Sequence, residues 1–170
     1  MMARRIPWIL FASLLIFAIL YVTRSAPHLP PMVASHFDAY GYPNAFMTRA
    51  RYTQFVLGFA VALPIVIVAL LTAVYAGAKD FKLPNRDYWL APERIARTRG
   101  LLIAHGVWFG SLMVVMVCCV QWLELDAHRH VPPQLSHRLV SAALLAFFLI
   151  TAGWIAVLLT AFRLPRSAAE

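Results

Sequence analysis

Four long apolar segments alternate with shorter polar segments along this chain. The apolar segments cover residues 6–22, 55–75, 101–123 and 139–162, and none of them contains Asp, Glu, Lys or Arg. A helix needs about 20 apolar residues to cross a hydrocarbon layer of about 30 Å. Because lipid offers the backbone no hydrogen bonds, such segments must be helical. The pattern predicts an all-α integral membrane protein, a four-helix transmembrane bundle with a structured extracytoplasmic loop.

The composition indicates a single membrane domain that covers residues 1–170. Hydrophobic residues make up 62% of the chain and charged residues 13%, which is far from the balance of a soluble domain. The net charge of +8 does not indicate nucleic acid, because the basic residues lie in short segments beside the spans. There they favour contacts with anionic lipid, so the lipid bilayer is the expected partner.

The distribution of Lys and Arg predicts the orientation of the chain. The segments before the first span, between the second and third spans, and after the fourth contain 10 of these residues, whereas the other two loops contain 5. Basic residues are enriched in cytoplasmic loops. We therefore expect a multi-pass protein of the bacterial inner membrane, N-in and C-in, with an outer loop at 23–53 and an inner loop at 79–99.

The two longer loops carry local signals of structure. Prolines disfavour long regular structure in the outer loop, where they stand at Pro27, Pro30, Pro31 and Pro43. Its many apolar side chains are not typical of a disordered linker, so we expect a folded cap against the outer membrane face. In the inner loop, Pro92 followed by Glu93 is typical of a first helical turn, which predicts a helix that begins there and continues into the third span.

Small residues predict which helices pack closely. Gly106 and Gly110 form a GxxxG spacing in the third span, and this spacing lets two helix backbones approach each other. The fourth span has the same spacing in two alanine pairs, Ala142 with Ala146 and Ala152 with Ala156. We expect these two spans to pack as an antiparallel pair. In the second span, Pro64 predicts a bend that improves packing or shapes a pocket.

The outer loop also carries a longer motif, LPPMVASHFDAYGYPN at residues 29–44. This segment resembles the pattern LP..(I/V)..HF(D/N)..G.P(D/N) of the bacterial membrane family known as domain of unknown function 1648. The segment PNRDYWL at residues 84–90 is similar to the one that follows the second span in that family. The motif positions form the expected ligand or partner loop: Leu29, Pro30, His36, Phe37, Asp38, Gly41, Pro43 and Asn44.

The resemblance implies an SdpI-related N-terminal module in a small inner-membrane protein. The chain has four spans and no visible second homologous module. The expected function is that of a binding, sensing or immunity-type module that acts through the outer loop with its His-Phe-Asp motif. The alternative is a small transporter or an accessory subunit of a membrane complex.

Histidines and carboxylates on the expected outer side have two interpretations. Imidazole and carboxylate groups suit zinc or copper, which makes a metal ion held by His36, Asp38, His128 and His130 one hypothesis. The other interpretation is structural, with the Asp38 side chain bonded to backbone amides, Gly41 at positive φ, and His36 bonded across the loop. Recognition of a protein or peptide partner by the same loop is compatible with the structural interpretation.

One ionisable side chain, His105, lies well inside a span, where such groups are candidates for function. A neutral imidazole bonded to a neighbouring helix is the simpler interpretation, and a role in proton or substrate movement is the other. No paired nucleophile and base and no nucleotide-binding motif is visible, so we expect no enzyme, no catalytic residue and no cofactor other than the metal ion above. An oligomer is compatible with this pattern.

Overall fold

The computed structural model describes residues 5–77 and 82–163. Four of its helices are long and apolar enough to cross a membrane, as the four apolar segments predict: α1 (Ile6–Ser25), α2 (Arg49–Gly77), α4 (Ile95–Ala127) and α5 (His137–Ala161). The chain is therefore described as a multi-pass membrane protein. α2 and α4 extend well beyond the predicted spans, because the polar residues that flank them continue the helices.

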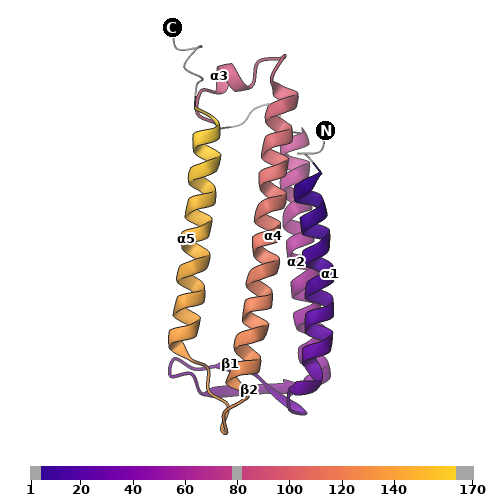
Figure 1. The fold of residues 1–170 in the computed structure, drawn as a ribbon, viewed down its shortest axis with the longest axis vertical. Helices are drawn as coiled ribbons and strands as arrows, with labels where there is room; N and C mark the ends of the chain where they lie inside the picture. The colour runs from indigo at the N-terminus through magenta and orange to yellow at the C-terminus, as the bar shows by residue number, and fades with distance from the viewer. Residues whose placement is uncertain (1–4, 78–81, 164–170) are drawn as a thin grey trace.

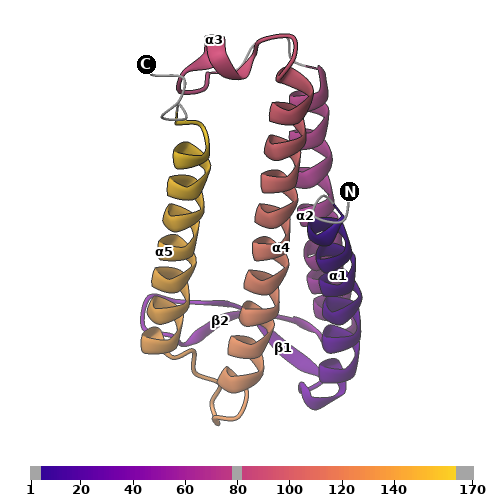
Figure 2. The same ribbon diagram turned by 45° about the horizontal axis from the view of Figure 1, so that its top comes forward.

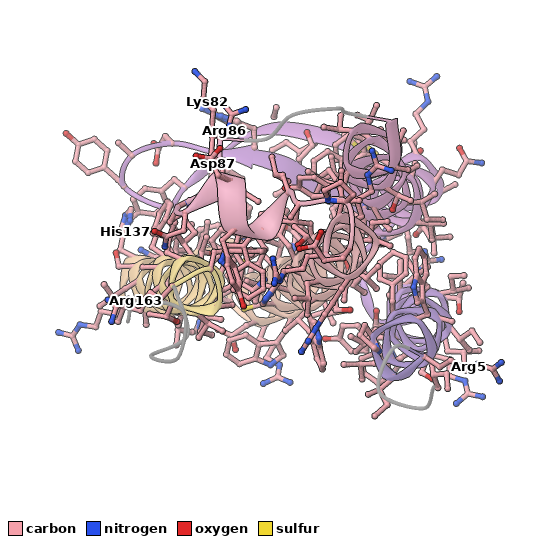
Figure 3. The ribbon with its side chains drawn as sticks, turned by 90° about the horizontal axis from the view of Figure 1, so that it is seen from above. Arg5, Lys82, Arg86, Asp87, His137 and Arg163 are labelled. Atoms are coloured by element: carbon pink, nitrogen blue, oxygen red, sulfur yellow. The ribbon has the colours of Figure 1, made fainter. Side chains whose placement is uncertain are left out.

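Three of the long helices pack together and the fourth lies to one side. α4 contacts both α1 and α2 along its length, whereas α5 touches the rest of the molecule mainly through α4 (Figures 1 and 2). Within the described structure, no residue of α5 is buried. Viewed along the helices, Arg5 beside α1 and Arg163 beside α5 lie at opposite sides of the molecule (Figure 3). The fold is thus a three-helix core with a lateral fourth helix.

The GxxxG segment of α4 faces α1 and α2. A Cβ atom at Gly110 would overlap the Val68 side chain of α2 and lie 3.2 Å from Phe11 of α1, and one at Gly106 would lie 3.3 Å from Leu71 of α2. The prediction that this segment packs against α5 is therefore wrong. The GxxxG spacing predicts that some helix packs closely against α4, but it does not specify which one. The small residues of α5 can face lipid equally well, because lipid is as apolar as a neighbouring helix. Pro64 is fully buried in an uninterrupted α2.

A polar network joins the three core helices near the ends that precede and follow the outer loop. Tyr52 of α2 donates from its hydroxyl to Gln121 Oε1 at 3.0 Å, and Gln121 Nε2 of α4 donates to Ser25 Oγ of α1 at 2.9 Å. Gln121 is fully buried, and the other two side chains are buried as well. Since each polar group has a partner on another helix, the network stabilises the relative positions of all three helices.

The loop at 23–53 contains a short 3-10 turn, Ala26–His28, followed by an antiparallel hairpin. Its strands are β1 (Met32–Phe37) and β2 (Pro43–Thr48), and β2 leads directly into α2. Asp38 Oδ1 accepts from the backbone amides of Tyr40 and Tyr42 at 2.8 and 2.9 Å, and Gly41 has φ +83°. The predicted structural role of Asp38 and Gly41 is confirmed, whereas the strands themselves were not predicted.

The opposite end of the molecule is closed by a short helix, α3 (Arg86–Trp89). Trp89 Nε1 and Asn85 Nδ2 both donate to the backbone oxygen of Phe162, at 2.8 and 3.1 Å, so α3 caps the last turn of α5. α4 begins at Ile95, after a turn that contains Pro92 and Glu93. The predicted continuation of this helix into the third span is confirmed. The helix begins three residues later than predicted, after a turn in which the Ala91 carbonyl accepts from the amides of Arg94 and Ile95.

Candidate functional site

A cavity of about 320 Å³ lies where the hairpin, α4 and α5 meet, and we call it the hairpin-end pocket. One wall consists of three consecutive β1 residues from the predicted ligand loop. The remaining walls come from the last turns of α4, the following loop and the first turns of α5. Its lining residues are Ser35, His36, Phe37, Met116, Val120, Leu123, Glu124, Leu135, Val140, Ala143 and Leu144.

Two hydrogen bonds, each donated by a backbone amide, hold the hairpin over this pocket. The amide of Ala34 donates to His128 Nε2 at 3.1 Å, which fixes β1 to the end of α4. The amide of Leu135 donates to the Gly41 oxygen at 2.9 Å, which fixes the hairpin turn to the segment before α5. A Cβ atom at Gly41 would overlap the Leu135 carbonyl oxygen. Glycine is therefore required here for two reasons, the close approach of this oxygen and the positive φ of the turn.

His36 is oriented by a contact across the hairpin. Its Nδ1 lies 2.6 Å from Asn44 Oδ1, and because an amide oxygen only accepts, Nδ1 carries the proton in this pairing. The expected bond across the loop is therefore confirmed. Nε2 is the remaining polar atom of the ring, and His36 is exposed at the mouth of the pocket. With its proton on Nδ1, this tautomer has Nε2 as its hydrogen-bond acceptor.

Glu124 is the acidic residue of the pocket. Its residue exposure is only 9%, and Oε1 is buried without a hydrogen-bond partner among the described residues. His128 Nδ1 lies 3.4 Å from Oε1 but is closer to the Glu124 backbone oxygen, at 2.9 Å. Because His128 Nε2 accepts from Ala34, the neutral ring has a single proton, on Nδ1. Glu124 is therefore not paired with a full positive charge in this arrangement.

The proposed metal ligands do not assemble. Among the described residues, no group of three or more His, Cys, Asp or Glu side chains could hold a metal ion. Of the four candidates, His128 is bonded to Ala34 and Glu124, His36 to Asn44, and Asp38 to the turn amides. His130 is exposed beyond the end of α4. The structure thus brings these side chains into separate hydrogen bonds, and the metal ion stays a prediction.

The other residues of the predicted loop mostly build the hairpin. Leu29 is buried, and its carbonyl, preceding Pro30, accepts from Arg49 at 2.9 Å. Pro43 opens β2 opposite Phe37. Of the predicted ligand-loop residues, His36 and Phe37 line the pocket, together with the neighbouring Ser35.

His105 lies in a second cavity, of about 440 Å³, between α1, α4 and α5. Its ring is 6.0 Å from the Trp154 ring, centroid to centroid, in an edge-on arrangement. The walls of this cavity are almost entirely apolar, with Leu10, Leu14, Leu112, Val115, Ile150 and Val157 among them. Such a groove fits a lipid chain at least as well as a polar substrate.

Among the residues that line the pocket, only His36 and Phe37 were predicted as site residues, and the buried acid Glu124 was not. Glu124 stands directly after an apolar span, where an acidic residue is common, so its sequence position alone carries little information. It shares the pocket with β1 residues that lie about 90 positions earlier in the sequence.

Comparisons with known proteins do not identify a relative of this chain. No model of a known protein family, no curated protein and no solved structure matches this chain. The resemblance to domain of unknown function 1648 therefore stays a prediction from the outer-loop motif.

Proposed function

We propose that this chain is a binding or sensing module of the bacterial inner membrane, of the SdpI-related type, whose ligand occupies the hairpin-end pocket. The observation that carries the proposal is the wall formed by Ser35, His36 and Phe37. The hairpin motif that the family resemblance singles out thereby contributes to a cavity with both polar and apolar surfaces. A rigid cap without a ligand would not need an open cavity at this point.

The proposed sidedness supports an extracytoplasmic ligand. α1 begins and α5 ends at the α3 end of the molecule, which also carries Lys82, Arg94 and Arg97 (Figure 1). The positive-inside tendency assigns this basic end to the cytoplasm and the hairpin end to the outside. The pocket would then lie at the outer membrane interface, within reach of ligands from the cell envelope or the outer leaflet.

The connection from β2 into α2 offers a route for a signal. β2 ends at Thr48 and α2 begins at Arg49, so a displacement of the hairpin acts directly on a helix that crosses to the other side. We expect ligand binding to change the position of the hairpin and thereby bias α2. In a sensing or immunity-type role, this movement of α2 would carry the signal of ligand binding to the other side of the membrane.

Site-specific photo-crosslinking tests the proposal. A benzoylphenylalanine residue at Ala143 reports from inside the pocket, and the same residue at Leu149, which is exposed on α5, reports from the lipid-facing surface. We expect an adduct of one discrete mass at position 143 in native membranes and only a mixture of bulk lipids at position 149. Identical adducts at both positions would contradict the proposal.

A hairpin variant serves as the control for this experiment. Gly41→Ala places a methyl group against the Leu135 oxygen and should move the hairpin away from the segment that precedes α5. We expect the discrete adduct at position 143 to decrease strongly in Gly41→Ala and to persist in Gly153→Ala, where a Cβ atom meets open space.

The second candidate is an accessory subunit of a membrane complex. The observation in its favour is the lateral position of α5, which buries no residue in the described structure and leaves a long apolar flank for a partner helix. Transport has weaker support, because the hydrogen-bonded polar network of the core is confined to the hairpin end. Crosslinking from Leu149 to a single protein rather than to lipid would favour the accessory role.

A further inference from the structure

The chemistry of the hairpin-end pocket narrows the class of ligand, an inference that rests on the proposed function. The pocket has one ionisable acid, Glu124, near its polar end. Oε1 of Glu124 has no hydrogen-bond donor among the described residues, and no Lys or Arg there forms an ion pair with it. The nearby cation Arg129 pairs with another residue, because its Nη1 lies 3.7 Å from Asp126 Oδ1. A buried carboxylate without a counter-charge is unfavourable, so the site favours a ligand that supplies one.

His128 does not supply this charge. Its Nε2 accepts the amide proton of Ala34, which requires an unprotonated Nε2 and hence a neutral ring. Its one remaining proton points toward the backbone and carboxyl oxygens of Glu124. The histidine therefore bonds the backbone of Glu124 and supplies no positive charge to its carboxyl group.

The rest of the pocket is apolar and continues along the helices away from the hairpin. Met116 and Val120 of α4 line it together with Val140, Ala143 and Leu144 of α5. Met116 precedes Glu124 by eight residues, which corresponds to about 12 Å along a helix. A ligand in this pocket thus contacts the acid Glu124 at one end and an apolar surface that extends about 12 Å from it along α4.

From this arrangement we propose that the pocket binds a cationic amphiphile, an alkyl chain that carries a protonated amine. The ammonium group donates to the carboxylate of Glu124, and His36 is the other pocket residue whose side chain can accept a hydrogen bond from it. The alkyl chain lies between α4 and α5, beside Met116, Val120 and Leu144, where no residue of α5 is buried by the rest of the described structure.

The test compares two probes of equal chain length, dodecylammonium and dodecanol. Binding is measured by calorimetry on the full chain, purified in a neutral detergent. We expect dodecylammonium to bind about 10- to 100-fold more tightly than dodecanol, as a charge-assisted hydrogen bond to a buried acid implies. Glu124→Gln should abolish this preference. Asp126→Asn is the matched control, since it removes a carboxylate two residues away that faces Arg129, and it should retain the preference.

Equal binding of the two probes, or a preference that survives Glu124→Gln, would overturn the inference. A third variant, Ala143→Phe, separates this failure from a failure of the proposed function. If both probes bind equally and Ala143→Phe abolishes the binding of both, the pocket still binds amphiphiles and only the cationic class is wrong. If Ala143→Phe changes neither, the pocket is not the ligand site. Should Glu124→Gln fail to fold, the two probes and Ala143→Phe still decide the matter.

Discussion

The imidazole of His128 accepts the backbone amide of Ala34 at 3.1 Å, across 94 residues of sequence. The side chain of His128 is only 3% exposed, so this bond is shielded from water. It joins β1 to the end of α4, which are two walls of the hairpin-end pocket. One of the two long-range hydrogen bonds that hold the hairpin over the pocket therefore requires a histidine whose Nε2 is unprotonated.

Replacing His128 by Phe should release β1 from α4. The Ala34 amide loses its acceptor, which we expect to cost about 1–3 kcal/mol of local stability. Hydrogen exchange followed by mass spectrometry should show faster exchange at residues 32–37, by about tenfold or more. His130→Phe is the control, because the His130 side chain is exposed and forms no hydrogen bond in the described structure. Unchanged exchange in His128→Phe would exclude this bond as the anchor of the hairpin.

Gln121→Leu should weaken the three-helix core. The substitution leaves the Tyr52 hydroxyl and Ser25 without their partners on α4. Interhelical hydrogen bonds in membranes typically contribute about 0.6 kcal/mol and at most about 1.7 kcal/mol each, so we expect a loss of about 1–3 kcal/mol for the two. Unfolding in mixed micelles with a denaturing detergent measures this. Gln54→Leu, on the exposed face of α2, should have no comparable effect.

Gly110→Ala should destabilise the fold more than Gly106→Ala, because the added Cβ at Gly110 has the closer neighbours. The new Cβ overlaps Val68 and approaches Phe11, which forces α4 away from both core neighbours. Overpacking of this kind costs about 1–3 kcal/mol. Gly153→Ala on α5 meets open space and should leave stability unchanged in the same unfolding assay. Equal stability of the two variants would argue against the close contact of α4 with α1 and α2.

Trp89→Phe should loosen the end of α5 while keeping an aromatic ring against Phe162. The substitution removes the Nε1 donor that bonds the Phe162 oxygen at 2.8 Å. We expect faster hydrogen exchange and earlier proteolysis near residues 158–163, with no change at the hairpin end. Trp122→Phe, whose side chain is exposed on α4, is the matched control. If both variants behave alike, α3 does not hold α5 in place.

Much of this fold follows from local patterns in the sequence. Four uncharged apolar segments suffice to predict four spanning helices, because membrane insertion depends on length and hydrophobicity alone. The Asp38 turn and the His36 contact were also predictable, since both join residues that are close in sequence. What these signals share is that each is contained within one short segment.

The pocket itself could not be predicted, because its walls meet only through long-range contacts. Nothing near Glu124 in the sequence indicates that β1 covers it, and nothing near Gly110 indicates that its neighbour is Val68 rather than an alanine of α5. Helix faces that are apolar all round give no preferred partner. Among the described residues, no metal-binding group forms from His36, Asp38, His128 and His130. Residues at the same end of a molecule can each form hydrogen bonds with different nearby groups, and the sequence does not show which ones.

The most direct test of the central claim, an extracytoplasmic pocket under the hairpin, is thiol labelling in intact cells. Tyr40→Cys lies on the hairpin turn with 76% exposure, and Asp87→Cys lies on α3 at a fully exposed side chain, both in a background without Cys118 and Cys119. A membrane-impermeant maleimide should label position 40 from outside and reach position 87 only after the cells are opened. Labelling of position 87 but not position 40 in intact cells would contradict the proposed orientation. The proposal that the pocket binds an extracytoplasmic ligand would then be wrong as well.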